Sequence, residues 1–229
     1  MTQYAQLAIL IPCYNEEECI REAIQAASPF GQVFVINNGS TDRSVSIAQE
    51  SSAIVINEMR RGYGNAIMTG MLEAKRRGKT IALILDADLS DDPQNTPVLV
   101  NPIVNGEKDF VLSCRTRKED QGNLEPHQRF GNELAVWMMK QAIGYKYRDM
   151  GPFRAFDIQK VLDLHMEDEN FGWNIEMQMK AVHAKLRIQE IELPYRKRLA
   201  GVSKVSGNVK SSIKAGRIIL QSVFRYAKA

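Results

Sequence analysis

The chain has little of what disulfide-bonded and zinc-binding proteins need, because it holds only three cysteines and three histidines among 229 residues. The cysteines are odd in number and lack CxxC spacing, and the histidines form no HExxH or other zinc-ligand pattern. No apolar run approaches the ~18 residues that a membrane-spanning helix requires, and the first twelve residues lack the basic start and cleavage site of a signal peptide. These absences argue against disulfides and structural zinc, and they predict a cytoplasmic protein.

Acidic residues are missing from the end of the chain, although the overall balance of Lys+Arg 30 against Asp+Glu 27 is nearly even. Residues 193–229 include nine basic residues and no Asp or Glu, so the preceding 192 residues carry 21 basic and 27 acidic groups. We therefore expect the tail to bind anions, which could be substrate phosphates, an acidic membrane surface or nucleic acid. Its few aromatic residues, Tyr195, Phe224 and Tyr226, argue against single-strand nucleic-acid binding.

Hydrophobic residues make up 44% of the chain and charged residues 25%, which is typical of one ordinary globular domain. This composition excludes intrinsic disorder, a collagen-like repeat and a coiled coil as descriptions of the whole. No repeat or linker divides the chain. We expect one domain over residues 1–195, followed by a basic loop and C-terminal helix over 196–229.

Strand and helix signals alternate in the first half. Short apolar runs rich in Val and Ile predict strands buried on both faces at 7–11, 33–36, 54–56 and 81–85. The stretches 17–27, 41–49 and 65–77 have lengths suited to right-handed helical crossovers. The pattern predicts an α/β fold with a parallel, doubly wound sheet, whose ligand site lies where the carboxyl ends of the strands open into loops.

Asp86 and Asp88 directly follow the apolar run 81–85. Two carboxylates at i and i+2 can point from a turn toward one hard divalent cation, and such a cation keeps coordination positions free for a diphosphate. The alternative is that both residues only cap the helix that Asp91, Asp92 and Pro93 introduce. Burying an aspartate without a cation or donors is costly, which favours the metal.

Polar loops follow the first two strands. Pro12-Cys-Tyr-Asn-Glu16 and Asn37-Asn-Gly-Ser-Thr-Asp42 offer tight turns with donors and acceptors for a base or ribose. A third segment, Arg60-Arg-Gly-Tyr-Gly-Asn-Ala66, opens a helix, and its glycines would let backbone approach a ligand closely. It lacks the spacing of a dinucleotide fingerprint or a P-loop, and taken alone it is more simply a loop-to-helix turn.

The order of these motifs, with Asp-Ala-Asp last, resembles the inverting glycosyltransferases of family 2, which have the GT-A fold. Within that family the chain is most similar to the polyprenyl-phosphate sugar synthases of the dolichol-phosphate mannose or glucose synthase type. The resemblance continues in Ser113-Cys-Arg115, Arg129-Phe-Gly-Asn132, Asp149-Met-Gly-Pro-Phe-Arg154 and the segment 195–204. It implies a mostly parallel mixed sheet flanked by helices, with a nucleotide-binding part at about 1–115 and an acceptor part at about 116–195.

The resemblance also implies roles for the first motifs. Pro12, Tyr14 and Glu16 would line the nucleoside pocket with Gly39 and Gly64, while Asp86 and Asp88 would hold Mg²⁺ or Mn²⁺ on the diphosphate. Position 37 departs from the family, which usually has Asp there. Asn37 can still accept a hydrogen bond from one imide N–H, as uracil offers, but it gives guanine no charge-assisted bond, so UDP is favoured over GDP.

Basic side chains on separate loops match the positions that grip an acceptor phosphate in the lipid-linked enzymes. Guanidinium groups bind phosphate in a bidentate manner, so arginines from several loops would make a clamp. The alternative is that they are surface charges. The resemblance assigns the acceptor phosphate to Arg115, Arg129 and Arg154, and a mobile loop over the diphosphate to Arg198, Ser203 and Lys204.

Glu176 lies in the first turn of a helix expected over 173–185. In relatives that attack with a hydroxyl, a carboxylate near this region serves as base, and a sugar could rest on Trp173. The preferred interpretation is that Glu176 complements the helix dipole and Trp173 packs in the core. A phosphate acceptor is already ionised at neutral pH and needs no base.

The C-terminal segment shows helical spacing of apolar and basic residues. Ile213, Gly216, Leu220, Val223 and Phe224 would share one face, with Lys210, Lys214 and Arg217 beside it. Such a helix suits an anionic lipid surface, although packing on the domain is the more common fate.

These observations predict an inverting, metal-dependent transferase that moves a hexose from a nucleotide sugar, UDP-glucose before GDP-mannose, to a polyprenyl phosphate. Asp88, Arg115 and Arg129 would carry the chemistry, and the protein would be cytoplasmic and peripheral on the inner face of the membrane. Two alternatives stay open. One is a family 2 enzyme with a soluble hydroxyl acceptor and Glu176 as base, and the other is a non-catalytic binder of nucleotide sugar or nucleic acid.

Overall fold

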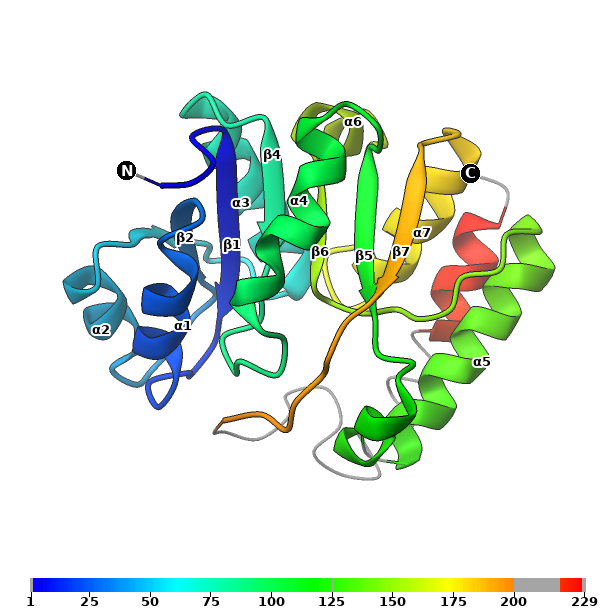
Figure 1. The fold of residues 1–229 in the computed structure, drawn as a ribbon, viewed down its shortest axis with the longest axis horizontal. Coiled ribbons are helices and arrows are strands. Elements are labelled where there is room, and N and C mark those ends of the chain that lie inside the picture. Colours follow the sequence, from blue (N-terminus) through cyan, green and yellow to red (C-terminus); the bar gives the residue numbers. More distant parts are fainter. Residues whose placement is uncertain (1, 125, 200–218, 228–229) are drawn as a thin grey trace.

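The computed structural model describes residues 2–124, 126–199 and 219–227. Its centre is a seven-stranded sheet in the order β3-β2-β1-β4-β6-β5-β7 (Figure 1). All neighbouring strands run parallel except β6, which is antiparallel to both β4 and β5. The mostly parallel, mixed sheet of the sequence prediction is therefore confirmed. The strands are β1 (Leu7–Cys13), β2 (Gln32–Asn37), β3 (Ile54–Asn57), β4 (Ile81–Ile84), β5 (Phe110–Cys114), β6 (Arg154–Asp157) and β7 (Ile188–Glu192).

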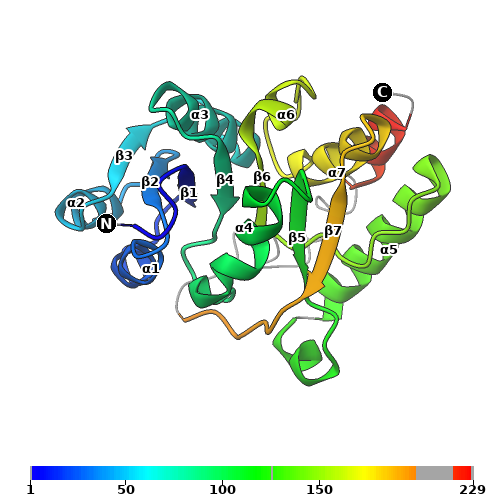
Figure 2. The same ribbon diagram turned by 45° about the horizontal axis from the view of Figure 1, so that its top comes forward.

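Helices cover both faces of the sheet, as the views in Figures 1 and 2 show. On one face lie α1 (Ile20–Ala27), α2 (Ser44–Glu50) and α4 (Thr96–Val104), whose buried residues form one core. On the other lie α3 (Tyr63–Arg76), α5 (Pro126–Ile143), α6 (Ile158–Leu162) and α7 (Trp173–His183), which form a second core. Two 3₁₀ turns, η1 (Pro93–Asn95) and η2 (Lys118–Asn123), complete the described elements.

Alternation along β1 explains why the strand is apolar at almost every position. Leu7, Ile9 and Ile11 belong to the core under α1 and α4, whereas Ala8 and Leu10 belong to the core under α3 and α7. A central parallel strand has no solvent face, because successive side chains point to opposite faces that are both covered. The runs at 7–11, 33–36 and 81–85 therefore lie in strands with both faces buried, as predicted. The run 54–56 became β3, which is only half-buried because it lies at the edge of the sheet.

The first two strands end beyond the apolar runs, whereas β4 ends at Ile84, one residue before its run does. Parallel pairing of β1 with β2 continues through Pro12↔Ile36 and Cys13↔Asn37, two residues past the expected limit. The helices also shift: α1 starts at Ile20, three residues later than expected, because residues 17–19 form a turn. Asp92 caps η1 by accepting a hydrogen bond from the Gln94 amide at 3.0 Å, so the expected helix start there is confirmed.

The last described residues are helical at 219–226 and lie beside α5 and α7 (Figure 1). Val223 and Tyr226 are buried in the core that α7 covers, whereas Leu220 and Phe224 are exposed. The apolar residues expected on one face are therefore divided between core and surface. Ile213, Gly216, Lys210, Lys214 and Arg217 lie outside the described residues. Within the described part of the chain, no helix has both the length and the apolar character needed to cross a membrane.

Candidate functional site

The loops after β1 and β2 are joined by hydrogen bonds at the carboxyl edge of the sheet. Because Cys13 and Asn37 are partners in register, the residues that follow them lie side by side. The Asn15 amide donates to Ser40 Oγ at 3.1 Å, and Asn15 Oδ1 accepts from the Thr41 amide at 2.8 Å. The structure thus brings together the two polar loops that the sequence placed on separate strand ends.

Asn37 has partners within the protein for both groups of its side-chain amide. Oδ1 accepts from the Ser40 amide at 2.9 Å, and Nδ2 donates to Asn57 Oδ1 at 2.8 Å. Asn57 ends β3 and is exposed, so it extends the same polar edge by one more strand. The sequence analysis missed Asn57, although its place at the end of an apolar run is the same signal that identified Asn37.

Tyr14 lies under a basic side chain that the sequence analysis did not select. The Arg61 guanidinium carbon is 4.5 Å from the centroid of the Tyr14 ring, and its Nη2 donates to the carbonyl of Gly39 at 3.3 Å. Gly39 has φ +86°, which favours glycine there. Pro12, Tyr14 and Glu16 are all half-buried. Arg61 therefore links the glycine-rich turn to the loops after β1 and β2.

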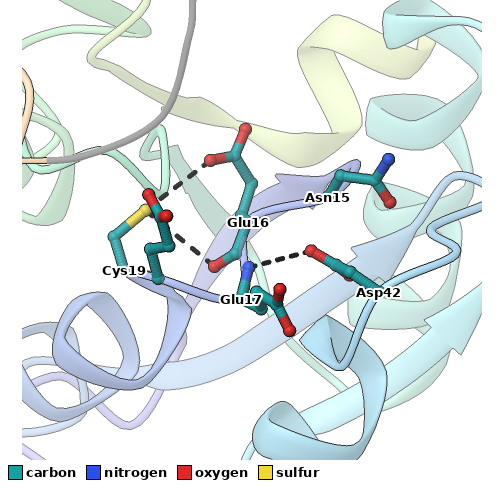
Figure 3. A pocket seen from close by; sticks show the side chains of 6 residues that line it. Asn15, Glu16, Glu17, Cys19 and Asp42 are labelled. Carbon is teal, nitrogen blue, oxygen red and sulfur yellow. Dashed lines mark hydrogen bonds between the residues drawn. The ribbon is translucent and has the colours of Figure 1, made fainter.

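A hollow of about 190 Å³ lies beside the end of β1 and is lined by Asn15, Glu16, Glu17, Glu18, Cys19 and Asp42 (Figure 3). The Glu17 amide donates to Asp42 Oδ2 across it at 3.1 Å. Burial raises the pKa of Cys19 to about 12 and that of Cys13 to about 11, so both thiols stay protonated at neutral pH. Neither cysteine is a nucleophile in this setting.

The glycine-rich turn owes its composition to a close backbone contact. A Cβ on Gly64 would lie 2.0 Å from the carbonyl oxygen of Asp168, and one on Gly62 would lie 2.1 Å from that of Glu169. The Asn65 amide donates to the same Glu169 oxygen at 3.1 Å. The predicted role of Gly64 in approaching a nucleotide stays a prediction, and in this structure the glycine makes room for the loop 167–169.

Glu176 binds the backbone of the loop 167–169. It is fully buried in α7, where its Oε1 accepts from the Glu167 amide and its Oε2 from the Asp168 amide, each at 2.7 Å. Lys180 Nζ lies 2.8 Å from Oε1. Both oxygens are thus engaged with backbone, and Trp173 is buried in the core. This geometry agrees with the interpretation of Glu176 as a first-turn carboxylate of α7 and of Trp173 as a packing residue, and it gives Glu176 no open path to an acceptor hydroxyl.

Asp86, Asp88 and Asp91 concentrate negative charge after β4. Burial and the neighbouring Asp88 raise the pKa of Asp86 to about 7. Burial likewise raises the pKa of Asp91 well above its ordinary value, and neither of its carboxylate oxygens has a hydrogen-bond partner in the described part of the chain. Among the described residues, no three Asp, Glu, His or Cys side chains converge to hold a metal by themselves. The excess charge fits a cation that takes further ligands from a bound diphosphate.

Arg115 forms a buried ion pair rather than an open phosphate clamp. Its Nε and Nη2 donate to the two oxygens of Asp149 at 2.8 and 2.9 Å, and its amide donates to Oδ2 at 2.7 Å. Burial alone would raise the pKa of Asp149, but Arg115 more than offsets it and lowers that pKa. Only 15% of the Arg115 side chain is exposed.

The other two arginines of the expected clamp are placed differently. Arg129 is exposed in the first turns of α5, three residues before Asn132, whose Oδ1 accepts from the Met150 amide at 3.0 Å. Arg154 is fully buried in β6, with Nε donating to the Gly151 carbonyl at 3.1 Å. Among the three, Arg154 is therefore separated from the open edge, and in this structure it supports the loop before β6.

The segment 193–199, called the strap here, runs from β7 back across the ends of the strands (Figure 2). Tyr195 forms a bridge with Asp91, and the Arg115 guanidinium lies 5.3 Å from the centroid of the Tyr195 ring. Arg198 Nη2 lies 3.0 Å from Asp88 Oδ2. The strap thus brings Arg198 to the paired aspartates, whereas Ser203 and Lys204 lie outside the described residues.

Comparisons with known proteins agree on one family. The sequence model of Glycosyl transferase family 2 matches residues 8–163. An uncharacterised glycosyltransferase of Mycobacterium bovis is 33% identical over 209 residues, which cover 90% of this chain and 93% of that protein. The UDP-N-acetylglucosamine–dolichyl-phosphate N-acetylglucosaminyltransferase of Methanococcus voltae is 25% identical, with coverage of 81% and 83%.

Solved structures share the fold. The glucosyl-3-phosphoglycerate synthase of Mycobacterium tuberculosis, solved with Mn²⁺, UDP and phosphoglyceric acid, superposes with a TM-score of 0.78 at 17% identity. The alignment covers 98% of this chain and 79% of that one. At this level of identity the likeness establishes the architecture of the sheet and its helices.

Proposed function

Because the chain belongs to glycosyl transferase family 2 and is a glycosyltransferase with the GT-A fold, we propose that it transfers a hexose from a nucleotide sugar to a polyprenyl phosphate. The observation that carries this proposal is the single edge of the sheet at which the loops after β1 and β2 meet the aspartates after β4. Pro12, Tyr14, Glu16, Asn37 and Gly39 would bind the nucleoside there. Inversion at the sugar follows from direct attack by the acceptor.

Asp86 and Asp88 would hold Mg²⁺ or Mn²⁺. The raised pKa of Asp86 and the partnerless oxygens of Asp91 support this role, because they indicate negative charge that the described protein leaves uncompensated. When bound, the cation would supply charge stabilisation for the departing diphosphate. The neighbouring structure with Mn²⁺ and UDP supports the same pairing of metal and nucleotide.

An acceptor that is already ionised fits this site better than a hydroxyl. Glu176 has both oxygens engaged by backbone amides, so it is not placed to remove a proton. A phosphate monoester carries its negative charge at neutral pH and needs only to be bound and oriented. Arg115, and Arg129 at the start of α5, would orient it. The dolichyl-phosphate relative supports this choice of acceptor.

The donor we favour is a uridine nucleotide, UDP-glucose or a similar hexose. An amide at position 37 can pair with uracil, whereas a carboxylate there would give guanine a charge-assisted bond. Nδ2 of Asn37 donates to Asn57 and Oδ1 accepts from the Ser40 amide, so the uracil N–H would be a second donor to that oxygen, which has two lone pairs. A uridine-containing donor is also named for the dolichyl-phosphate relative.

A membrane-facing surface would serve a lipid acceptor. Phe130 and Trp137 are exposed by 68% and 59% on α5, and Leu220 and Phe224 are exposed on the neighbouring residues 219–226. We call these four side chains the apolar patch. The chain around 193–229 is entirely without acidic residues. Exposed aromatic side chains beside basic charge suit the interface of an anionic bilayer, which would make the enzyme peripheral on the cytoplasmic face.

The metal assignment is tested by Asp88→Ala. Turnover of UDP-glucose with undecaprenyl phosphate and Mn²⁺ should be lost while circular dichroism shows an intact fold. The matched control is Asp92→Asn in the same loop, which keeps a capping side chain for η1 and should retain activity. An Asp88→Ala enzyme with an unchanged rate would overturn the assignment.

The acceptor is tested by product partition. Label from UDP-glucose should enter an organic phase when undecaprenyl phosphate is present, and it should stay in water when 3-phosphoglycerate replaces it. Transfer to 3-phosphoglycerate alone would instead support a soluble acceptor, as in the neighbouring synthase.

The membrane surface is tested by flotation with vesicles of phosphatidylglycerol and of phosphatidylcholine. We expect Trp137→Ser and Phe130→Ser to weaken binding to the anionic vesicles. Met59→Ser removes a side chain that is 86% exposed but lies before α3, at the other end of the sheet, and should leave binding unchanged. Equal loss in all three variants would refute the patch.

A further inference from the structure

The strap is held over the loop 88–92 by backbone as well as side chains. The Arg196 amide donates to the Ser90 carbonyl and the Leu199 amide to the Asp88 carbonyl, each at 2.8 Å. On its other side, the Tyr195 carbonyl accepts from Asn123 Nδ2 at 2.7 Å. These bonds fix the path of the strap independently of its charges, so the side chains at 196 and 198 are presented at defined positions.

Two arginines of the strap meet two different aspartates. Arg196 Nη2 lies 2.6 Å from Asp92 Oδ2, and Arg198 Nη2 lies 3.0 Å from Asp88 Oδ2. Asp92 caps η1 and has no part in the proposed cation site. Asp88 does, and it is nearly buried, with 9% of its side chain exposed. The neighbouring pairs therefore form a natural comparison, in which only Arg198 touches a proposed metal ligand.

Arg198 pairs with the same Asp88 carboxylate that would bind the cation. Among the residues that the structure describes, the Asp88 carboxylate is paired with Arg198 and accepts a bond from the Ser90 amide at 2.9 Å. A divalent cation held by the Asp88 carboxylate would be a second positive charge beside the Arg198 guanidinium, and like charges repel. The two cations can share the site only when additional negative charge arrives.

We propose that Arg198 is the resident countercharge of Asp88 and that it makes metal binding depend on the nucleotide diphosphate. This inference rests on the proposed function, because it concerns the cation of that site. Without nucleotide, the metal competes with Arg198 for one carboxylate. With nucleotide, the diphosphate oxygens supply the charge that lets Arg198 leave Asp88 and remain close to the leaving group.

The consequence is positive coupling between metal and nucleotide. Each should raise the affinity of the other by the same factor, because coupling between two ligands is reciprocal. The site then binds the metal together with the donor more tightly than it binds the metal alone. Arg198 acts through Asp88 and the diphosphate, so it is a positioning residue until contact with substrate is demonstrated.

The experiment measures Mn²⁺ affinity by electron paramagnetic resonance, on the full chain, with and without UDP. In the wild type we expect weak binding without UDP and much tighter binding with it. Arg198→Met should bind Mn²⁺ about tenfold more tightly without UDP, a change worth ~1.4 kcal/mol. In Arg198→Met, the increase in Mn²⁺ affinity that UDP causes should therefore be smaller than in the wild type.

Two further variants serve as controls. Arg196→Met removes the neighbouring strap charge and should leave both Mn²⁺ affinities at wild-type values. Arg198→Lys keeps the positive charge and should restore most of the coupling. Thermal melting of each variant reports whether the strap substitutions disturb folding. If Arg198→Met disturbs folding, Arg198→Lys still tests the proposal.

The outcomes separate this inference from the proposed function. If Mn²⁺ binds with UDP but Arg198→Met binds it no more tightly without UDP than the wild type does, the countercharge role is wrong and the cation site stands. If Arg196→Met has the same effect as Arg198→Met, the effect is general electrostatics, and the inference is also wrong. If the wild type binds no Mn²⁺ even with UDP, the proposed cation site itself fails.

Discussion

Glu176→Gln offers a sharp test, because one substitution separates a structural role from general-base catalysis. The wild-type carboxylate accepts two amide hydrogen bonds at 2.7 Å and pairs with Lys180 at 2.8 Å in a fully buried site. Glutamine keeps one acceptor oxygen, but it directs an NH₂ group at the second amide or at Lys180. Hydrogen bonds to charged groups contribute ~1.5–3 kcal/mol each, and breaking a buried ion pair costs ~3–5 kcal/mol.

We therefore expect the free energy of unfolding to fall by about 3 kcal/mol. For a chain of this size that corresponds to a Tm lower by about 6–12 °C. Activity per folded molecule should stay within about tenfold of the wild type, whereas removal of a general base typically costs ~10²–10⁴-fold. Because the loop 167–169 rests on the turn that carries Arg61, the loss should appear in KM for the nucleotide sugar more than in kcat.

The assay combines urea unfolding with steady-state kinetics at temperatures well below both transitions. Glu133→Gln, which changes an exposed carboxylate on α5, is the control and should alter neither quantity. A Glu176→Gln enzyme of unchanged stability whose kcat falls a hundredfold or more would refute the reasoning. It would also restore the alternative of a hydroxyl acceptor.

Two other predictions concern the same side of the molecule. Gly64→Ala places a Cβ 2.0 Å from the Asp168 carbonyl and should cost ~1–3 kcal/mol in urea unfolding. Gly122→Ala, whose Cβ meets no described atom within 4 Å, should cost less than ~0.5 kcal/mol, and equal effects would contradict the close contact. The Arg60 hydrogen bonds lower the pKa of Glu58 from 4.5 to about 2, so the stability that Glu58 contributes is present above 4.5 and is lost as the pH falls through 2. The destabilisation by Glu58→Gln in urea melts should therefore shrink over that interval, and a pH-independent difference would show that the ion pair is not its cause.

The fold of the first half could be predicted because its signals are local. Apolar runs of three to five residues, separated by crossover-length helices, allow few arrangements other than a parallel sheet covered on both faces. The carboxyl ends of such strands share one edge, so the meeting of the loops after β1 and β2 with Asp88 followed from order alone. The antiparallel β6 carried no such local signal. Its place between β4 and β5 depends on long-range pairing.

Individual side chains at the site were harder to assign. Arginine is usually exposed, so nothing in the sequence distinguishes Arg154, which the pairing of β6 turns into the core, from Arg129, which stays on the surface. Arg61 lies beside Gly62 in a recognised motif, but its contact with Tyr14 joins segments far apart in the chain. Spacing along one segment cannot report such contacts.

Local sequence pattern was enough to predict the class of sheet, the edge that bears the polar loops and the pair of aspartates after β4, because each depends on the order and period of nearby residues. The tertiary structure alone decided which charges are neutralised. It placed Glu176 under two backbone amides and Arg198 against Asp88, since the partner of a charged group is set by which distant segment the fold brings within a few ångströms of it.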